Sequence, residues 1–351
     1  MVYRLSLIRG DGIGPEITEA TLKVMEATGL KIEWEGVLVG EKAMAKFGHS
    51  FPDHSLETLK KNRVALKAPL IVSKDSEPIV VKKGRKKVAY PSINSALRRE
   101  LGCFVNIRPI KSFPGLPTRY PPIDLVILRE VTEDLYAGLE RQVKEGVAEA
   151  IKLTTKKACE RITRFSFEYA KKYGRKKITL GHKANVLHLT DGLFLRTALE
   201  IAREYPEIRF DDLMIDALSF QLVNNPGSFD ILLLSNQYGD ILSDLCAGLA
   251  GSLGLAPGAN LGDEYSLFEP SHGAALDIAG KGVANPLALV LSASLMLRHL
   301  GENRLGQEIE NAVGKLLQEG KVITLDLGGS ATTDDVAREL IRILTHRLER
   351  R

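Results

Sequence analysis

The sequence predicts an α/β fold with a largely parallel sheet at its core, and three observations support this prediction. Short apolar runs typical of buried strands alternate along the chain with amphipathic helical segments. Charged residues repeatedly follow the ends of these runs, where parallel sheets bind their ligands. The chain has 351 residues, 44% hydrophobic and 26% charged, which is typical of a globular protein with two domains.

The composition also excludes several classes of protein. There is no run of about 20 apolar residues to span a membrane, and the N-terminal residues lack a signal-peptide pattern. Cys103, Cys159 and Cys246 are scattered in apolar contexts, so we expect reduced core cysteines in a cytoplasmic protein. A net charge of +4 is too small to indicate nucleic acid, and it suits small acidic substrates. Sparse Gln with abundant Lys, Arg and Glu is a feature of thermophilic proteins.

The first expected strand, residues 3–8, leads into the turn Gly10-Asp-Gly-Ile-Gly-Pro-Glu16. A helix is expected from Pro15 to about Thr28, because proline suits the first helical position. Glycines between a strand and a helix let backbone N–H groups approach an anion, but a plain tight turn explains them equally well. The spacing is not the dinucleotide-binding GxGxxG fingerprint. Strands are expected next at 32–39 and 64–70, with helical residues 44–61 between them.

Residues 73–90 are polar and basic, and we expect a solvated loop there. A nucleic-acid-binding role would depend on its run Lys82-Lys-Gly-Arg-Lys-Lys87 alone, and salt-sensitive retention on polyanions would test that role. An amphipathic helix is expected from Ser92 to Leu101.

Three arginines flank consecutive elements in the next part of the chain. Arg98 lies in the expected helix, Arg108 follows a strand at 103–107, and Arg129 follows a strand at 125–128. Arginine grips carboxylates with two parallel hydrogen bonds, so the three suggest a site for a polyanion. Residues 136–153 are neither clearly helix nor core strand and could form an arm that reaches another subunit.

The remaining chain continues the alternation. Strands are expected at 177–181, 213–215 and 231–234, a glycine-rich region at 248–262, and helices over 155–172, 189–205, 217–223, from about 240, and over 286–299, 303–318 and 334–348.

Acidic and basic residues at these strand ends are candidates for catalysis. Asp240 and Asp244 lie one turn apart on one helix face, although acids also favour a solvated helix start. With Asp216 they form a set of hard oxygen ligands suited to Mg²⁺ or Mn²⁺. Lys183 is either a surface lysine or a general base whose pKa is lowered by cationic neighbours. Tyr136 is either an interface tyrosine or a general acid.

Six segments are spread in this order along nearly the whole length of the chain: GDGIGPE at 10–16, LRRELGCFVNIRP at 97–109, LYAG at 135–138, GHKANVL at 181–187, NQYGDILSDLCAGLAGSLGLAPGANLG at 236–262 and EPSHGAALDIAGKGVANP at 269–286. They resemble the β-decarboxylating dehydrogenases, the family of isopropylmalate, isocitrate and homoisocitrate dehydrogenases. The long aspartate-containing segment is highly specific. The resemblance implies the isocitrate/isopropylmalate dehydrogenase-like fold, which is not a Rossmann GxGxxG fold.

By this resemblance, one domain combines residues 1–98 and 256–351 and binds the cofactor. The central domain, residues 99–255, would form a homodimer, possibly pairing into tetramers, with its arm at about 136–153. The active sites would be shared, with Lys183 and Asp216 from one subunit and Asp240 and Asp244 from the other. Arg98, Arg108 and Arg129 would bind the malate carboxylates.

The implied reaction oxidises a 2-hydroxy acid with NAD and then releases CO₂. Mg²⁺ or Mn²⁺ would chelate the substrate's hydroxyl and α-carboxylate oxygens and stabilise the enolate. Lys183 would help deprotonate the hydroxyl, and Tyr136 would protonate the enolate carbon.

The cofactor would lie along Gly10 to Gly14 and across the loop from His272, with Asn285 at the adenine. Asp277 and Ile278 stand where NADP-preferring relatives place cationic and phenolic groups. A carboxylate accepts from ribose hydroxyls and repels a 2′-phosphate, so we predict NAD. The expected cofactor residues are Gly10, Gly12, Ile13, Gly14, Asn185, His272, Gly273, Ala274, Ala275, Asp277, Ile278 and Asn285.

Ser92 and Asn94 resemble the Ser-x-Asn pattern of isocitrate dehydrogenases, which meets the γ-carboxylate, whereas isopropylmalate enzymes place apolar residues there. The arm is more similar to homoisocitrate dehydrogenases of lysine biosynthesis. We therefore expect a tricarboxylate substrate, with an isopropylmalate-directed or broad-specificity enzyme as the alternative and a non-catalytic subunit as a remote one. The chain departs from the family at Phe104, at Ala275-Leu276 and in the long segment 73–90.

Overall fold

The structure, a computed structural model, describes residues 2–72, 78–83 and 86–349. A ten-stranded sheet runs through the molecule in the order β11-β10-β12-β7-β6-β13-β14-β3-β1-β2. Its strands are β1 (Tyr3–Ile8), β2 (Ile32–Gly36), β3 (Val64–Lys67), β6 (Val105–Lys111), β7 (Asp124–Glu130), β10 (Lys177–His182), β11 (Arg209–Met214), β12 (Ile231–Leu234), β13 (Pro257–Leu261) and β14 (Ser266–Pro270).

Strand pairing is parallel at both ends of the sheet and antiparallel in its middle. The pairs β1–β2, β1–β3, β3–β14, β10–β11, β10–β12 and β7–β12 are parallel, and β6–β7, β6–β13 and β13–β14 are antiparallel. The predicted α/β fold with a largely parallel sheet is therefore confirmed. Every residue of β3 and β12 is buried, as expected for parallel strands covered on both faces.

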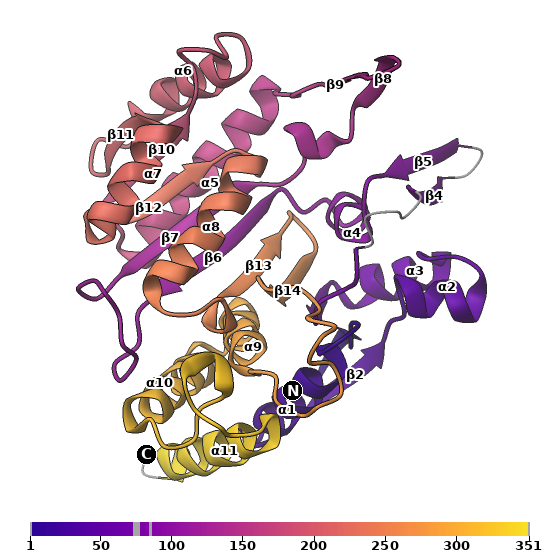
Figure 1. The fold of residues 1–351 in the computed structure, drawn as a ribbon, viewed down its shortest axis with the longest axis vertical. Coiled ribbons are helices and arrows are strands. Elements are labelled where there is room, and N and C mark those ends of the chain that lie inside the picture. The colour runs from indigo at the N-terminus through magenta and orange to yellow at the C-terminus, as the bar shows by residue number, and fades with distance from the viewer. Residues whose placement is uncertain (1, 73–77, 84–85, 350–351) are drawn as a thin grey trace.

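The helices lie around this sheet in separate groups (Figure 1). Helices α5 to α8 lie with β7, β10, β11 and β12 at one end of the sheet, α1 and α9 to α11 lie together beside both chain termini, and α2 to α4 form a further group. The helices are α1 (Gly14–Glu26), α2 (Glu41–Phe47), α3 (Asp53–Asn62), α4 (Ile93–Glu100), α5 (Lys156–Tyr173), α6 (Thr190–Ala202), α7 (Ile215–Asn224), α8 (Asn236–Ala250), α9 (Leu287–His299), α10 (Asn303–Glu319) and α11 (Thr333–Glu349). Strand β6 meets β13 where the two expected domains adjoin, and the domain boundaries themselves stay a prediction.

Several sequence predictions differ from the structure in their secondary structure. The expected helix over 44–61 is two helices, because Gly48 ends α2 in a left-handed conformation and Pro52 precedes α3. The helix expected from about Asp240 begins earlier, at Asn236. The glycine-rich region 248–262 contains the end of α8 and strand β13.

The expected loop at 73–90 was the largest error. A two-stranded antiparallel hairpin, β4 (Ile79–Lys83) and β5 (Lys86–Tyr90), occupies most of it, while residues 73–77 and 84–85 lie outside the described residues. Val81 and Tyr90 are buried against α4. Burial alternates along these strands, with Val81 buried and Val80 exposed, but the residue types Ile79-Val80-Val81 do not alternate, so the sequence carried no period-two pattern.

The segment expected to form an arm is a second hairpin, β8 (Glu140–Lys144) and β9 (Val147–Ala150), which projects from the body of the molecule (Figure 1). Every residue of both strands is exposed. A lone two-stranded hairpin is marginally stable in water, so this arm needs a packing partner. Within the described residues, none of the helices is both long and apolar enough to span a bilayer.

Candidate active site

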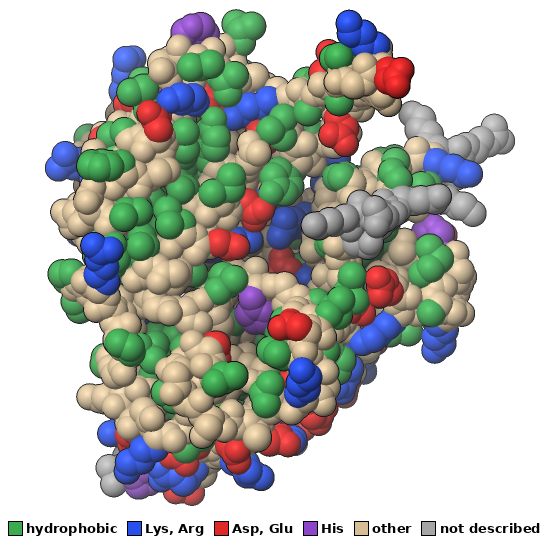
Figure 2. Space-filling model, in the orientation of Figure 1, with side chains coloured by type: hydrophobic (Ala, Val, Ile, Leu, Met, Phe, Trp, Pro, Cys, Tyr) green, Lys and Arg blue, Asp and Glu red, His purple; other side chains and the backbone are tan. Residues whose placement is uncertain are grey.

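A cavity of about 540 Å³ lies between α4, the ends of β6 and β7, the start of α8 and the loop after β14. On the corresponding face of Figure 2, charged side chains of both signs gather in a hollow near the middle of the molecule. Eleven of the predicted site residues line it, namely Ser92, Asn94, Arg98, Arg108, Arg129, Tyr136, Asp240, His272, Gly273, Ala274 and Ala275. The structure therefore brings together the predicted substrate residues and part of the predicted cofactor loop.

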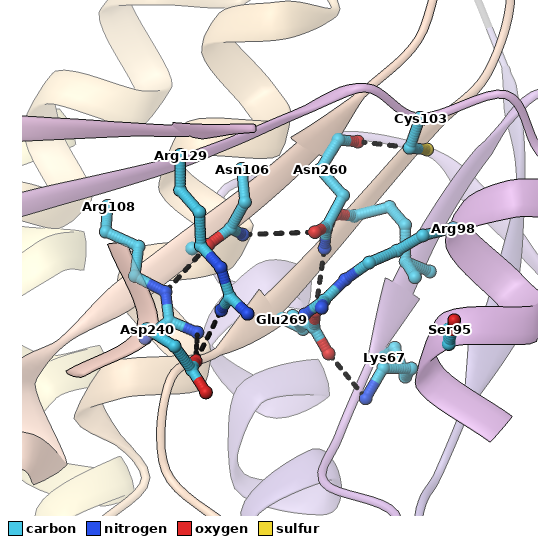
Figure 3. Close-up of polar contacts among 12 residues, drawn as sticks. Lys67, Ser95, Arg98, Cys103, Asn106, Arg108, Arg129, Asp240, Asn260 and Glu269 are labelled. Carbon is cyan, nitrogen blue, oxygen red and sulfur yellow. Dashed lines mark hydrogen bonds and ion pairs between the residues drawn. The ribbon is translucent and has the colours of Figure 1, made fainter. Parts of the chain in front are cut away.

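The three arginines converge on the cavity from three elements, as Figure 3 shows. Arg98 comes from α4, whereas Arg108 and Arg129 lie inside β6 and β7, not after their ends as predicted. Arg108 and Arg129 are only 6% and 1% exposed. A buried cation is costly unless it is paired, so their partners matter.

Helix α8 supplies those partners. Arg108 Nη1 lies 3.2 Å from Asp244 Oδ1, and Arg129 pairs with Asp240. Arg129 Nη2 also donates to Asn236 Oδ1 at 2.6 Å. The helix packs directly on this arginine, since a Cβ added at Gly239 would lie 2.6 Å from Arg129 Cγ. The first turns of α8 are thus held against Arg108 and Arg129.

Lys67 and Glu269 are site residues that sequence reasoning missed. Lys67 Nζ lies 2.6 Å from Glu269 Oε2, and Glu269 Oε1 accepts from Arg98 Nη2 at 3.0 Å and from Asn260 Nδ2 at 2.7 Å. Burial alone would raise the pKa of Glu269, but Lys67 and Arg98 outweigh it and hold that pKa well below its usual range. A lysine that ends a wholly apolar strand was the signal available in the sequence.

Several polar atoms on the cavity wall are buried and have no hydrogen-bond partner among the described residues. They are Asn94 Oδ1, Arg98 Nε, Ser271 Oγ and His272 Nε2. Leaving a buried polar atom unpaired costs about 1–3 kcal/mol. Four such atoms around one cavity indicate a site built for a polar ligand.

Tyr136 and Asp240 meet at the edge of the cavity. The Tyr136 hydroxyl donates to Asp240 Oδ2 at 2.6 Å, and the Arg129 guanidinium lies 5.1 Å from the centre of the tyrosine ring. Burial and the Asp240 carboxylate raise the pKa of Tyr136 to about 12. Burial would raise the pKa of Asp240, but Arg129, the Tyr136 hydrogen bond and Arg108 lower it. The tyrosine therefore holds its proton beside a carboxylate that is ionised at neutral pH.

Lys183 and Asp216 form a separate pair at the ends of β10 and β11. Lys183 Nζ lies 2.6 Å from Asp216 Oδ1, and this hydrogen bond is the main cause that lowers the pKa of Asp216. Neither residue lines the cavity. No three His, Cys, Asp or Glu side chains within the described ranges are placed to hold a metal ion together. Within one chain the predicted metal ligands therefore lie in two separate places, Asp240 and Asp244 on α8 and Asp216 beside Lys183.

The predicted cofactor glycines pack closely against neighbouring backbone, Gly10 against the segment after β3 and Gly12 against the loop that follows β14. Gly10 and Gly12 have φ values of 68° and 56°, and added Cβ atoms would lie 2.3 Å from Pro69 O and 2.0 Å from Ala274 O. Gly14 is equally tight, with Arg9 O at 2.6 Å, and the Ile13 N–H donates to Ala274 O at 2.9 Å. Close packing requires these glycines, so a tight turn and an approach to an anion are both compatible with them.

The remaining cofactor residues are more spread out. Asp277 is exposed beyond the cavity, Ile278 is half-buried, and Asn185 is exposed near Lys183. The Asn285 side chain is held in place, because its Nδ2 donates to Asp326 Oδ2 at 3.0 Å and its Oδ1 accepts from Leu287 N at 3.0 Å. Its NH₂ group keeps a second N–H, and its oxygen a second lone pair, for a further contact. Asp326 was not predicted, and nothing in its sequence context indicated it.

This fold and this cationic cavity, with acidic residues at its edge, define a dehydrogenase of the isocitrate/isopropylmalate class. The family model for isocitrate/isopropylmalate dehydrogenase matches residues 4–340. The chain belongs to this family, and its relatives include NAD-dependent isocitrate dehydrogenases.

Named relatives fall into both substrate groups. The chain is 44% identical over 336 residues to the mitochondrial "Isocitrate dehydrogenase [NAD] catalytic subunit 5" of Arabidopsis thaliana, covering 95% of this chain and 87% of that protein. It is also 44% identical over 341 residues to the 3-isopropylmalate dehydrogenase of Archaeoglobus fulgidus, covering 97% and 99%. The crystal structure of isocitrate dehydrogenase from Methylococcus capsulatus matches with a TM-score of 0.92 and 43% identity, covering 98% and 99%.

Proposed function

We propose that this protein oxidatively decarboxylates a 2-hydroxy tricarboxylate, homoisocitrate or isocitrate, to the 2-oxo acid and CO₂ with NAD and Mg²⁺ or Mn²⁺. The observation that carries the substrate class is the unpartnered, buried amide oxygen of Asn94 on the cavity wall. A half-turn of the amide presents its NH₂ group to a carboxylate instead. Ser92 lies two residues earlier on the same wall. An apolar substituent would leave the Asn94 amide unpaired at a cost of about 1–3 kcal/mol, whereas Ser92 Oγ already accepts from Ser95 N at 3.2 Å.

The three arginines suit the carboxylates of the substrate that Ser92 and Asn94 would not contact. Lys67, Arg98, Arg108 and Arg129 carry four positive charges, whereas their paired residues Glu269, Asp240 and Asp244 carry three negative ones. Arg98 Nε has no partner in the described structure and is free to donate to a bound carboxylate. The cavity therefore retains cationic capacity for an anionic ligand.

The metal would be held by Asp240 and Asp244 together with the partner subunit's Asp216. Carboxylate oxygens suit Mg²⁺ and Mn²⁺. When bound, the metal supplies Lewis acidity at the oxygens of the substrate. Asp240 is held in place by Arg129 and Tyr136 within one chain, which pre-positions one side of such a site.

Two residues would move protons. Lys183 from the second subunit would take the proton of the substrate hydroxyl as hydride leaves for NAD. Tyr136 would return a proton to the carbon that loses CO₂, and its high pKa keeps it protonated until then.

NAD is favoured over NADP by the exposed Asp277 carboxylate on the cofactor loop. The loop contacts Gly12 and Ile13 through Ala274, so the two segments expected to contact the cofactor adjoin.

A homodimer with shared active sites would complete the set of metal ligands and give the arm a packing partner, and two such dimers could pair into a tetramer. The arm exposes apolar side chains, with Val143 53% and Ile151 53% exposed. Helices α7 and α8 expose Phe220 at 70% and Ile241 at 60%. Such apolar surface is typical of subunit interfaces. Residues 1–98 with 256–351 would form the cofactor domain and residues 99–255 the dimerisation domain.

A second candidate is 3-isopropylmalate as the substrate. Leu70, Ile71 and Val72 also line the cavity, and an apolar wall could receive an isopropyl group. The relatives include enzymes named for each substrate.

The decisive experiment measures NAD reduction with isocitrate, homoisocitrate and 3-isopropylmalate in parallel, with Mg²⁺ or Mn²⁺ present. Higher kcat/KM for a tricarboxylate would support the proposed contact of Asn94 with a substrate carboxylate. The ratio of kcat/KM for homoisocitrate to that for isocitrate would assign the protein to lysine synthesis or the citric acid cycle. Preference for isopropylmalate would favour the second candidate. No reaction with any of the three, with NAD or NADP, would exclude the proposed function.

A further inference from the structure

The proposed catalytic residues Lys183 and Tyr136 belong to different segments, and a buried ion cluster lies between these segments. The cluster consists of Lys152, Asp134 and Asp191. Lys152 Nζ lies 2.6 Å from Asp191 Oδ1 and 3.7 Å from Asp134 Oδ1. The Lys152 side chain is 12% exposed, that of Asp191 is 4% exposed and that of Asp134 is 3% exposed. Lys152 lies at the base of the arm, two residues after β9 ends.

Asp191 holds the backbone of the proposed general base. Its Oδ2 accepts from the Lys183 N–H at 2.7 Å, while its Oδ1 pairs with Lys152. Asp191 lies in the first turn of α6, where the helix dipole favours a carboxylate. The backbone of Lys183 is therefore fixed by a charge that Lys152 neutralises.

Asp134 holds the segment of the proposed general acid. Its Oδ1 accepts from Leu135 N at 2.9 Å and caps the short 3₁₀ helix η1 (Leu135–Ala137), which contains Tyr136. Its Oδ2 accepts from Gln237 N at 2.9 Å, in the first turn of α8. The same carboxylate therefore ties Tyr136's turn to the helix that carries Asp240.

Asp134 also adopts a costly backbone conformation. Its φ is 69° and its ψ is −157°, a region that residues with a side chain rarely occupy. A non-glycine residue keeps such a conformation only when its surroundings determine it. The contacts to Lys152, Leu135 and Gln237 provide that determination.

We infer that Lys152 is a positioning residue that sets the geometry of Lys183 and Tyr136 at once, through Asp191 and Asp134. This inference rests on the proposed function. If active sites are shared in a dimer, Tyr136 serves its own site and Lys183 serves the partner's. Lys152 then joins the two sites within one chain. The aromatic ring of Tyr238, from α8, packs against the cluster, and its centre lies 4.4 Å from Lys152 Nζ.

The test compares Lys152→Met with wild type by steady-state kinetics and by hydrogen exchange. Displacing reacting groups by about 1 Å costs on the order of 10²-fold in rate, so we expect kcat to fall by about that factor. The KM for the tricarboxylate should change by less than about threefold, because the arginines that bind carboxylates lie outside the cluster. The Lys183 and Gln237 amides should exchange faster, while those of β1 and β3 should not.

Control variants separate positioning from general destabilisation. Lys152→Arg keeps a cation that can bridge two carboxylates and should recover most of kcat. Lys156→Met removes an exposed lysine near the same arm, 60% exposed and 3.7 Å from Glu160, and should behave as wild type. If Lys152→Met does not fold, Asp191→Asn is used, which keeps an acceptor for Lys183 N–H but loses the ion pair, and kcat should fall about tenfold.

The outcomes distinguish the inference from the proposed function. Wild-type kcat in Lys152→Met, or faster exchange throughout the sheet, would overturn the inference. If wild type reduces NAD with none of the three substrates, the proposed function fails, and the exchange at Lys183 and Gln237 alone decides whether Lys152 orders these segments.

Discussion

The hydroxyl of Tyr136 donates to Asp240 Oδ2 at 2.6 Å, so the proposed proton donor and a proposed metal ligand form one unit. This contact joins the start of the arm to the first turn of α8. Burial and the Asp240 carboxylate raise the pKa of Tyr136 to about 12, so the phenol stays protonated. Acid–base function and metal binding are therefore expected to depend on each other.

Tyr136→Phe should lower kcat by about 10²-fold, since loss of a positioned general acid costs 10²–10⁴-fold. The KM for the substrate should hardly change, because the arginines still bind its carboxylates. Phenylalanine keeps the ring beside Arg129, so the melting temperature should stay near that of wild type. A kcat within threefold of wild type would remove Tyr136 from this role.

Removal of divalent metal by EDTA should abolish NAD reduction, and Mn²⁺ or Mg²⁺ should restore it. The far-ultraviolet circular dichroism should not change, because Arg129 and Tyr136 hold Asp240 without a metal. Asp240→Asn should be inactive at any metal concentration. Asp263→Asn, at an exposed acid on the turn between β13 and β14, is the matched control. Full activity after EDTA treatment would contradict the proposed metal requirement.

Asn94→Leu should lower kcat/KM for the preferred tricarboxylate by about 10- to 10²-fold, the equivalent of about 1–3 kcal/mol for one lost polar contact. The same variant should accept 3-isopropylmalate better than wild type. Asn94 is the cleaner target because Ser92 Oγ accepts from Ser95 N as the cap of α4, so its removal also costs about 1 kcal/mol of helix stability. If the ratios of kcat/KM among the three substrates do not change, Asn94 does not contact the substituent that distinguishes these substrates.

Replacing the acid on the cofactor loop should shift cofactor preference. The double variant Asp277→Lys with Ile278→Tyr should raise kcat/KM for NADP and lower it for NAD by about tenfold, because a cation attracts the 2′-phosphate that the carboxylate repels. Asp263→Lys makes the same charge change away from the loop and should leave the ratio as in wild type. If both variants behave alike, Asp277 is not the discriminating group.

Glu269→Gln should destabilise the fold, since removing one partner of a buried ion pair costs about 3–5 kcal/mol. The pKa of Glu269 is lowered from 4.5, so its contribution to the free energy of unfolding is complete above about pH 4.5 and is lost as the pH falls below that value. Calorimetric melting temperatures should therefore differ most near neutral pH and converge in acid. A difference that grows on acidification would contradict this assignment.

The order of strands and helices could be predicted because each depends on local periodicity. The apolar run Ile231–Leu234 is a buried parallel strand, and Asp240 follows it on a helix as expected. The hairpin β4–β5 could not be predicted, because its pairing depends on Val81 and Tyr90 packing against α4. The lysines in these strands are typical of a loop.

For the site, residues at element ends were predicted and residues joined by tertiary contacts were not. Arg98, Arg108 and Arg129 converge as expected, although two of them lie within antiparallel strands. Lys67 and Glu269 are far apart in sequence, and their ion pair exists only because β3 and β14 are neighbours in the sheet. Whether Lys183 and Asp216 reach the cavity of a second chain stays a prediction.

The pairing of β3 with β14 has a consequence for biosynthesis. Val64 of β3 aligns with Ser266 of β14, so the ribosome must add roughly 200 residues after β3 before its neighbour exists. At about 5–20 residues per second this takes some 10–40 seconds. Throughout that time β3 has one open edge in a nascent chain whose strands β6, β7, β10, β11 and β12, neighbours at the other end of the sheet, can already associate. The half that contains both termini is therefore expected to fold last, and a chaperone would act on the exposed edge of β3.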